Sequence, residues 1–473
     1  MLQLPPISRV IRALAVALWL ALVVPLASIE ISLLVSPSQS VEAGGQSLAL
    51  SAGPSASTSG PGTLELFGQS IPTTQQFSGP IRPRLLWAQV THYDELLRAL
   101  KQPAHLGQDL RSGWSAYFTR QLVIAVLVAA TLAALTFALL RRRWQEVVAG
   151  IAVALLVAGV VDAVAISSAA QGLQQLSHVR TLDQLVGRSP LAIDTTPHRA
   201  PNATATTVVI GDSTAAGAGN PQVAHATVED SACRRSRDSY AADIAAVNAS
   251  TVINLACTNA SIEDGLFASE VINGALVQSQ LARLEAMHGI KTVIVSIGAN
   301  EMHWTQLMEL CLVAPQCDDT ASAAWFAQAL DSFTIDYYDL LQRLASLPGL
   351  PRVIVNEYYN PLPVNPDCSG QPAITAAKSA VLLSRLTTFN TVLADGAASF
   401  GFDAVAPNFA GHELCTPQSF VQGLGDSAPL HPTAAGEIAI ALADEQALLN
   451  PAPPRPTGAA TPSPTGAATP SPS

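Results

Sequence analysis

The stretch Thr206-Thr-Val-Val-Ile-Gly-Asp-Ser-Thr-Ala-Ala-Gly217 decides the fold of the second half of the chain. Its first five residues are all β-branched, which is typical of a buried strand. The run stops at Gly211-Asp212-Ser213, where glycine permits a sharp turn, and Ala-rich sequence follows. We therefore expect Ser213 at the carboxyl edge of a sheet, beside helix N–H groups that would stabilise a developing oxyanion. Because all three residues also favour plain turns, the tripeptide alone indicates no more than a turn.

Strand and helix patterns alternate from Thr206 to about Leu449. The candidate strands are short and mostly apolar: Thr206–Ile210, Thr251–Leu255, Lys291–Ile297, Arg352–Asn356 and Asp403–Val405. The clearest helical stretches between or after them are Ala321–Ala345, Ala373–Ala398 and Thr433–Leu449. This alternation predicts an α/β fold, with a parallel sheet covered by helices on both faces. In such sheets, ligands bind beyond the carboxyl ends of the strands.

Polar motifs follow the predicted strands at this edge. Ser296-Ile-Gly-Ala-Asn-Glu301 places Asn300 where its side-chain N–H groups would serve an oxyanion hole, although Gly and Asn also favour turns. The loop Asn254–Ser261 is able to present a backbone N–H. His431 directly precedes a helix that Thr433 can cap, a position that suits a general base. A histidine taken alone is more often an ordinary surface residue.

Together, these motifs resemble the GDSL, or SGNH-hydrolase, superfamily over roughly Thr204 to Leu449. The resemblance implies a flavodoxin-like three-layer α/β/α domain that hydrolyses carboxylic esters through an acyl-serine. It makes Ser213 the nucleophile and His431 the base. The oxyanion hole would comprise the Ser213 N–H, the Asn300 side chain and the backbone N–H of Asn259, where the family usually has glycine.

What orients His431 is a departure from the family pattern. The family commonly has Asp three residues before the histidine, and this chain has Ala428 there. Some secreted members with this cysteine pattern resemble a Ser–His dyad, in which a main-chain carbonyl holds the imidazole. We expect that arrangement here, with Asp426 as a weaker candidate for a third member because its spacing is wrong.

All six cysteines lie in the second half, and none forms a Cys-x-x-Cys pair, so a zinc site is not predicted. An even count in a domain outside the cell favours disulfides, but the count leaves the connectivity open. The segments Cys233-Arg-Arg-Ser and Asn254-Leu-Ala-Cys resemble secreted actinobacterial members, which implies pairing in sequence order. That order gives Cys233–Cys257, Cys311–Cys317 and Cys368–Cys415. Nothing in the sequence indicates a metal or an organic cofactor.

The first half is unusually apolar. The chain is 49% hydrophobic and 12% charged, with a mean hydropathy of +0.31, which predicts membrane segments. We expect three membrane-spanning helices, namely Ala13–Val35, Leu122–Leu140 and Val147–Ile166. A signal peptide is the alternative for the first run, but its apolar region is longer than that of a typical cleavable signal peptide, so we expect an uncleaved span. Basic residues flank these runs at Arg9, Arg12 and Arg141–Arg143.

Positive charge keeps short connections in the cytoplasm. We therefore predict a multi-pass plasma-membrane protein with a cytoplasmic N-terminus and everything after about Ser167 outside the cell. Asp162 lies near the outer end of the third predicted span, and we interpret it as reaching the interface rather than as functional.

These expectations divide the chain as follows: residues 1–35, cytoplasmic N-terminus and first span; 36–120, extracytoplasmic segment; 121–167, hairpin of two spans; 168–203, linker; 204–449, hydrolase domain; 450–473, disordered Pro/Thr/Ser-rich tail. Within 36–120 we expect a flexible Ser/Gly/Pro-rich part and then a small helical part from Leu85 to Leu110.

We expect a membrane-anchored, extracytoplasmic serine esterase or lipase acting on ester-bearing lipids or acylated glycans. One alternative is an O-acyltransferase or deacylase acting on envelope glycans or lipids, and another is a non-catalytic envelope-binding module. A net charge of −11 without a long basic run argues against a nucleic-acid partner. Substrate choice is expected to lie in loops such as Met302–Cys317 and Tyr358–Gly370.

Overall fold

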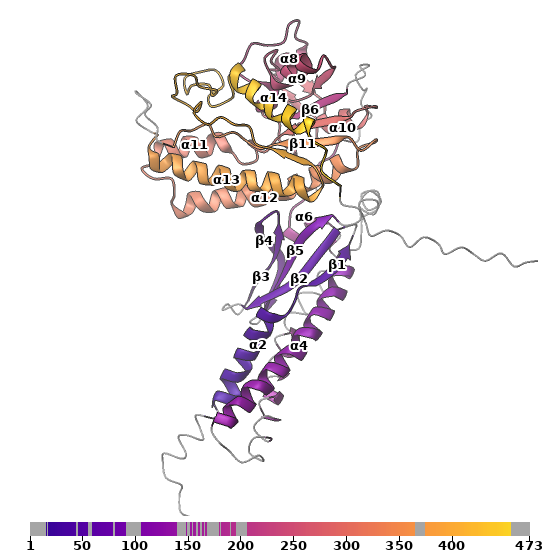
Figure 1. Ribbon diagram of the computed structural model, residues 1–473, viewed down its shortest axis with the longest axis vertical. Helices are drawn as coiled ribbons and strands as arrows, with labels where there is room; N and C mark the ends of the chain where they lie inside the picture. The colour runs from indigo at the N-terminus through magenta and orange to yellow at the C-terminus, as the bar shows by residue number, and fades with distance from the viewer. Residues whose placement is uncertain are drawn as a thin grey trace, which may run out of the picture. The chain divides into compact units, whose positions relative to one another are not determined.

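The computed structural model describes residues 16, 18–43, 46–54, 59–78, 81–90, 106–139, 148, 152–153, 155–157, 159–160, 163–164, 166–167, 179, 181–189, 191–194, 206–364 and 374–455. The chain divides into two compact units (Figure 1). Unit 1 comprises Met1–Leu66 and Ser70–Ser189, and unit 2 comprises Phe67–Gln69 and Pro190–Ser473.

Unit 2 contains a five-stranded sheet with the order β12-β11-β10-β6-β7. All neighbouring strands in it are parallel. The strands are β6 (Thr207–Gly211), β7 (Val252–Asn254), β10 (Thr292–Ser296), β11 (Arg352–Asn356) and β12 (Asp403–Val405). The predicted strands and the parallel α/β fold are therefore confirmed, and β11 and β12 begin and end at the predicted residues.

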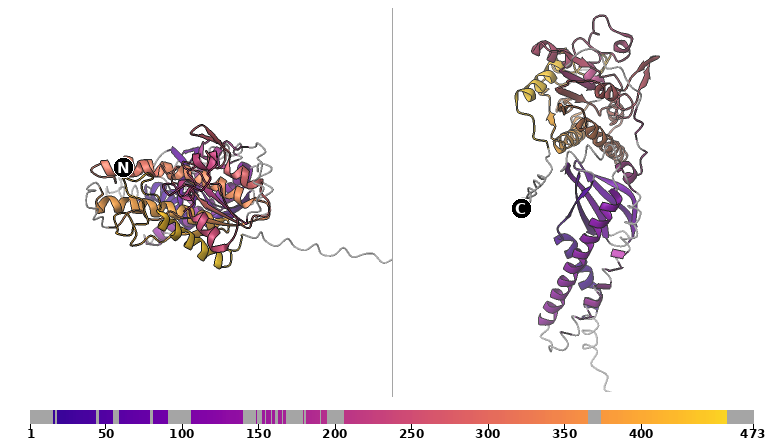
Figure 2. Two further views of the ribbon diagram at one scale, coloured as in Figure 1. Left: turned by 90° about the horizontal axis from the view of Figure 1, so that it is seen from above. Right: turned by 90° about the vertical axis from the view of Figure 1, so that its right-hand side faces the viewer.

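Helices cover both faces of this sheet, because its central strands are apolar on both sides. On one face, α9 (Tyr240–Asn248) and α14 (Ala434–Leu449) pack on a core that includes Val209, Ile294 and Ile354. The other face carries α12 (Thr320–Ala345) and α13 (Ala376–Ser399), and the two sets lie on opposite sides of the strands in Figures 1 and 2. The remaining elements of unit 2 are α7 (Ser213–Ala216), α8 (Val228–Ala232), α10 (Gln280–Glu285), α11 (Trp304–Val313) and the hairpin of β8 (Glu270–Ile272) and β9 (Ala275–Val277).

The strand order explains where a site can form. The chain passes from β6 to β7 on one side, and β10, β11 and β12 then extend the sheet on the other side of β6. At such a switch point the connections diverge to opposite faces and leave a crevice beyond the carboxyl ends of the strands. Ser213 follows β6 and Asn300 follows β10, so both lie at this crevice.

Unit 1 contains a mixed five-stranded sheet with the order β1-β2-β5-β3-β4. Its strands are β1 (Gln39–Ala43), β2 (Gln46–Pro54), β3 (Ser59–Leu66), β4 (Gln69–Ser78) and β5 (Ile81–Val90). β5 pairs antiparallel with β2 and parallel with β3. The prediction of a flexible first part was therefore wrong. Of the helical part predicted from Leu85 to Leu110, residues 85–90 are strand, residues 91–105 lie outside the described part, and residues 106–110 are helical.

That error has a physical cause. Along β3 only Leu64 and Leu66 are buried apolar side chains, and they alternate with Thr63 and Glu65 after a Gly- and Pro-containing start. Alternation with so few apolar residues resembles a loop, because Gly and Pro are depleted in strands. Unit 1 also contains the short helix α6 (Leu182–Val186).

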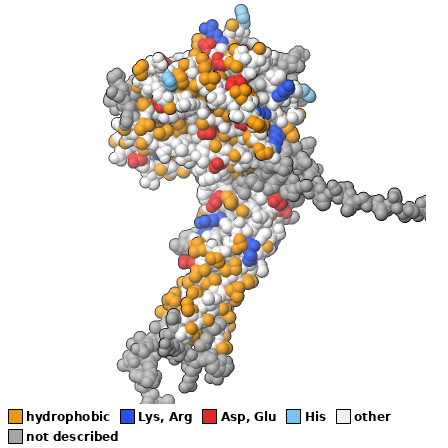
Figure 3. Space-filling view, in the orientation of Figure 1, with side chains coloured by type: hydrophobic (Ala, Val, Ile, Leu, Met, Phe, Trp, Pro, Cys, Tyr) orange, Lys and Arg blue, Asp and Glu red, His pale blue; other side chains and the backbone are white. Residues whose placement is uncertain are grey.

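The long helix α4 (Leu106–Leu139) contains a stretch, Asp109–Ala138, that is long and apolar enough to cross a membrane. Among the described residues it is the one such helix, whereas α2 (Val24–Val35), preceded by the π-helical turn η1 (Trp19–Val23), is shorter. The described residues thus show one candidate span rather than the three expected; nine of the twenty residues of Val147–Ile166, Asp162 among them, lie outside the described part. Figure 3 shows hydrophobic side chains along the visible face of α2 and α4. Leu26, Leu34 and Leu127 of these helices are exposed.

Candidate active site

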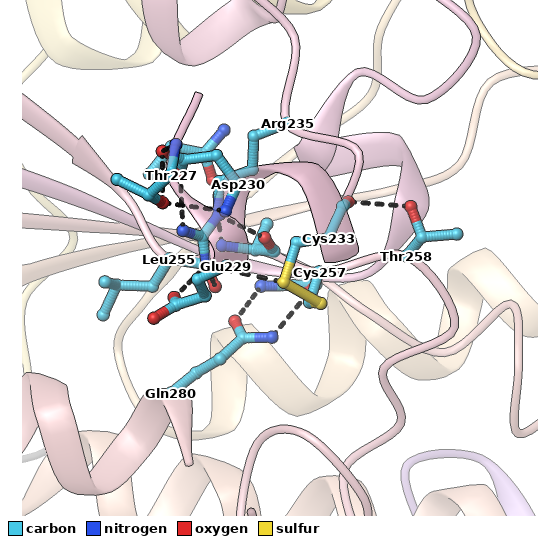
Figure 4. The surroundings of a disulfide bond; sticks show 12 residues. Thr227, Glu229, Asp230, Cys233, Arg235, Leu255, Cys257, Thr258 and Gln280 are labelled. Atoms are coloured by element: carbon cyan, nitrogen blue, oxygen red, sulfur yellow. Dashed lines mark hydrogen bonds and ion pairs between the residues drawn. A yellow bond between two sulfur atoms is a disulfide. The ribbon is translucent and has the colours of Figure 1, made fainter. Parts of the chain in front are cut away.

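Ser213 is the first residue of α7, directly after β6. The turn needs glycine at 211, because φ there is +148° and a Cβ would lie 2.0 Å from the Ser296 carbonyl oxygen. The Gln280 side chain holds this glycine from the side: its Oε1 accepts from the Gly211 N–H at 2.8 Å, and its Nε2 donates to the Gly211 carbonyl at 2.9 Å (Figure 4). The backbone that leads to Ser213 is therefore fixed.

His431 contacts Ser213 across 218 residues of sequence, with 2.7 Å between Nε2 and Oγ. Its other ring nitrogen, Nδ1, lies 3.0 Å from the Pro429 carbonyl oxygen. A carbonyl can only accept, so in the neutral ring Nδ1 carries the proton and Nε2 is left to accept from the serine hydroxyl. Burial lowers the pKa of His431, the positive charge of Arg234 lowers it further, and main-chain contacts with Pro429 and Ala428 work against this. The imidazole is thus neutral, and able to act as a base, at neutral pH.

Asp426 does not reach His431. It is exposed, and its Oδ2 accepts from the Gly423 N–H at 2.6 Å, closing a turn within its own loop. The weaker prediction of Asp426 as a third member is therefore wrong, and the position of the main-chain carbonyl is the one expected for a dyad.

The three N–H donors that the sequence predicts for the oxyanion hole belong to residues that line one cavity. They are the backbone N–H groups of Ser213 and Asn259 and the side chain of Asn300. The Asn300 Nδ2 donates to the Ala260 carbonyl at 2.7 Å, which orients the amide and leaves its second N–H free. Asn259 has φ of +70°, a left-handed conformation that Gly and Asn tolerate better than other residues. Within the described residues, the backbone N–H groups of Ser213 and Asn259 have no acceptor. The predicted loops thus present free donors at one place.

Tyr358, which the sequence motifs did not single out, connects two of these loops. Its hydroxyl donates to Oδ2 of Asp212 and accepts from the Ala299 N–H at 3.1 Å. It thereby joins the residue before Ser213 to the residue before Asn300. Burial raises the pKa of Asp212 to about 6, although hydrogen bonds from Tyr358 and Thr214 work against the rise. The sequence indicated Tyr358 only as the first residue of the predicted substrate loop Tyr358–Gly370, just past a parallel strand, and not as a link between these loops.

The cavity has a volume of about 420 Å³, within the range of small-molecule sites. Ser213, His431 and Asn300 form its polar end. Apolar side chains form much of the rest, namely Trp304, Met308, Leu386, Phe389 and Leu424. Trp304 and Met308 belong to α11, inside the predicted substrate loop Met302–Cys317. A polar end beside an apolar wall suits an ester with an acyl chain.

The predicted disulfides Cys233–Cys257 and Cys311–Cys317 are present. Cys415 is also disulfide-bonded, but its predicted partner Cys368 lies outside the described residues. Over the ranges that the structure covers, no group of three or more His, Cys, Asp or Glu side chains is placed to hold a metal ion.

Comparison with known proteins shows a similarity to one protein family. Residues 209–437 match the model of the GDSL-like lipase/acylhydrolase family. Among solved structures, the chain is similar to an extracellular lipase from Streptomyces rimosus (26% identity, TM-score 0.41, covering 50% of this chain and 96% of that one). It is also similar to phospholipase A1 from Streptomyces albidoflavus (24% identity, TM-score 0.41, covering 51% and 97%). No curated protein matches the chain.

Proposed function

We propose that Ser213 is the nucleophile and His431 the general base of this ester hydrolase, whose residues 209–437 match the model of the GDSL-like lipase/acylhydrolase family. The observation that carries this proposal is the 2.7 Å contact between Ser213 Oγ and His431 Nε2 inside the 420 Å³ cavity. A serine hydroxyl becomes a strong nucleophile only when a base accepts its proton, and this pair has the required geometry.

The proposed reaction has two steps. His431 takes the Ser213 proton as Oγ attacks the ester carbonyl carbon, and the resulting oxyanion is held by N–H groups of Ser213, Asn259 and Asn300. The intermediate collapses, the C–O bond to the alcohol breaks, and the alcohol oxygen takes the proton from Nε2. Water then attacks the acyl-serine with the same proton transfers, which releases the acid and restores Ser213. The Pro429 carbonyl keeps Nδ1–H oriented throughout.

We further propose that the protein is anchored in a membrane through α4 and two further apolar segments, with unit 2 outside the cell. The apolar stretch Asp109–Ala138, the Arg141–Arg143 triplet after it and the two disulfides support this location, because disulfides persist in oxidising compartments. Reporter fusions after Arg143 and after Ser167 are expected to report opposite sides of the membrane. Two cytoplasmic reporters would reject this topology.

The enzymatic proposal is tested on the full-length protein in detergent. We expect hydrolysis of p-nitrophenyl butyrate and laurate, and covalent labelling by a fluorophosphonate that Ser213→Ala abolishes. Labelling that persists in this variant would assign another nucleophile. Adding a glycan acceptor to the same assay detects acyl transfer, because an acylated glycan then appears in place of free acid.

A further inference from the structure

The turn Cys233–Arg235 is held firmly at its first residue. Cys233 is bonded to Cys257, and its carbonyl oxygen accepts from the Thr258 N–H at 3.2 Å and from the Thr258 hydroxyl at 2.9 Å (Figure 4). Cys233 is therefore fixed to the loop that carries Asn259, next to the proposed oxyanion hole.

Arg235 fixes the other end of the turn. Its side chain is 7% exposed and forms ion pairs with Glu229 at 2.7 Å and Asp230 at 3.0 Å. It also donates to the carbonyl oxygens of Ala256 at 2.9 Å and Leu255 at 3.0 Å. A buried guanidinium with this many partners has a structural role, because its charge and N–H groups are satisfied within the protein.

Arg234 lies between Cys233 and Arg235, and its backbone conformation, its exposure and its ion pairing set it apart from them. Its φ of +53° is left-handed, a conformation that a long side chain keeps only where its surroundings impose it. It is exposed and lines the cavity, and within the described residues it forms no ion pair. Its charge is also near enough to His431 to act on the imidazole. The fold thus imposes an unfavourable backbone conformation and leaves a free cation facing the reacting groups.

The position of the charge indicates which part of a substrate it faces. In the proposed reaction His431 gives its proton to the leaving alcohol, so a group beside the imidazole lies near the alcohol portion of the ester. The acid that lines the cavity, Glu309, is on α11 with Trp304 and Met308. The α11 side is therefore apolar and acidic, and the His431 side is basic.

We propose that Arg234 binds an anionic group on the alcohol portion of the substrate, so that the preferred substrates are esters of negatively charged alcohols. The acyl chain then lies against the apolar wall. This inference rests on the proposed function. The shared chemistry is an oxyanion, which a lipid phosphate or an acidic sugar can supply.

The first test compares two acetates with full-length protein: 4-acetoxybenzenesulfonate, whose alcohol portion is anionic, and neutral phenyl acetate. We expect Arg234→Gln to lower the ratio of kcat/KM values, anionic over neutral, by about tenfold or more, the scale of one lost charge-assisted hydrogen bond. Arg234→Lys should keep part of the preference, and added salt should weaken that of the wild type. The matched control is Arg237→Gln, since Arg237 is 64% exposed and does not line the cavity. A ratio within twofold of wild type in Arg234→Gln overturns the proposal.

The second readout is the pH profile on phenyl acetate. Arg234 lowers the pKa of His431, so Arg234→Gln should move the acidic limb of kcat/KM to higher pH, whereas Arg237→Gln should not. An unmoved limb in Arg234→Gln contradicts the assignment.

Two types of natural ester distinguish a lipid phosphate from an acidic sugar as the source of the anionic group. A monoacyl glycerol phosphate and an acetylated uronic acid are assayed with wild type and Arg234→Gln, and Arg234-dependent hydrolysis of either supports the proposal and names the source. If neither ester is hydrolysed, the result contradicts the proposal. Ser213→Ala tests the proposed function separately. If activity survives in Ser213→Ala, the proposed nucleophile is rejected. If activity is lost in Ser213→Ala but the ratio of kcat/KM values is unchanged in Arg234→Gln, only the anion site is rejected.

Discussion

The two five-stranded sheets of this chain differ in how they are built and in what they carry. In the five-stranded sheet of unit 2, every strand runs parallel to its neighbours. Helices therefore cover both faces of the sheet, and all carboxyl ends lie at one edge. In unit 1, β1 pairs antiparallel with β2, and β2 pairs antiparallel with β5, so carboxyl ends lie at both edges. Ser213, Asn300 and His431 of unit 2 line one cavity.

This difference shows why chemistry gathers in one sheet. A parallel arrangement brings residues that are far apart in sequence, such as Ser213, Asn300 and His431, to the same edge. A sheet with ends at both edges has no such meeting point. The comparison predicts that substitutions at the carboxyl edge of unit 2 remove activity, whereas similar changes in the sheet of unit 1 do not.

The largest expected effect is that of His431→Ala. Loss of the base should reduce kcat on p-nitrophenyl butyrate by about 10⁴-fold or more, as in other serine hydrolases. His288→Ala, an exposed histidine after α10, and Ser51→Ala, in β2, should each leave kcat within about twofold. A comparable loss in Ser51→Ala would mean that unit 1 takes part in the chemistry.

Asn300→Ala should have the next largest effect. It removes one donor from the proposed oxyanion hole, and we expect kcat to fall by roughly 10²–10³-fold with little change in KM. Steady-state kinetics on the same ester measure it. A rise in KM with unchanged kcat would assign Asn300 to substrate binding instead.

Tyr358→Phe should lower kcat by roughly tenfold, because it breaks the link between Asp212 and the Ala299 N–H and removes one hydrogen-bond partner from the buried Asp212 carboxylate. Tyr337→Phe is the matched control, since its buried hydroxyl donates to the Leu393 carbonyl at 2.9 Å, outside the cavity lining. Equal losses of kcat in the two variants would reduce the role of Tyr358 to general stability.

Asp444 links the stability of unit 2 to pH. Burial raises its pKa from 3.8 to about 8. Because the folded pKa lies above the unfolded one, its contribution is fully present below about pH 4 and is lost as pH rises through about 8. We expect the melting temperature of unit 2 to fall by a few degrees between pH 6 and pH 9, and Asp444→Asn to reduce that difference, both measured by calorimetry. An unchanged difference would show that Asp444 does not titrate in this range.

The smallest effect is expected for Asp426→Asn. Its carboxylate is bonded to the Gly423 N–H and not to His431, so kcat should change by no more than about several-fold. A loss near ~10⁴-fold, the scale of removing a triad aspartate's charge, would place Asp426 on the imidazole and reject the dyad.

How far the sequence could predict the molecule also differs between the sheets. β-branched runs such as Thr207–Ile210 are strands of unit 2, because strands buried on both faces need continuous apolar residues. Half-exposed strands such as β3 carry too few apolar residues to stand out from loops. The sequence motifs indicated Ser213 and His431, since turn and cap chemistry is local.

The supporting contacts of Gln280 and Tyr358 depend on tertiary packing instead. Gln280 contacts Gly211 across 69 residues, and Tyr358 contacts Asp212 across 146 residues. No local pattern marks either residue. The Asp426 prediction failed for a related reason, because nearness in sequence did not determine which backbone N–H the carboxylate would accept from.

The 218 residues between Ser213 and His431 have a consequence for the synthesis of the protein. The serine is made early, with the first strand of the parallel sheet, whereas the histidine directly precedes the last helix of that domain. A growing chain therefore holds an unactivated serine until almost the whole domain has emerged and α14 has folded against α9. In the proposed mechanism, hydrolytic activity therefore arises late in the synthesis of the chain.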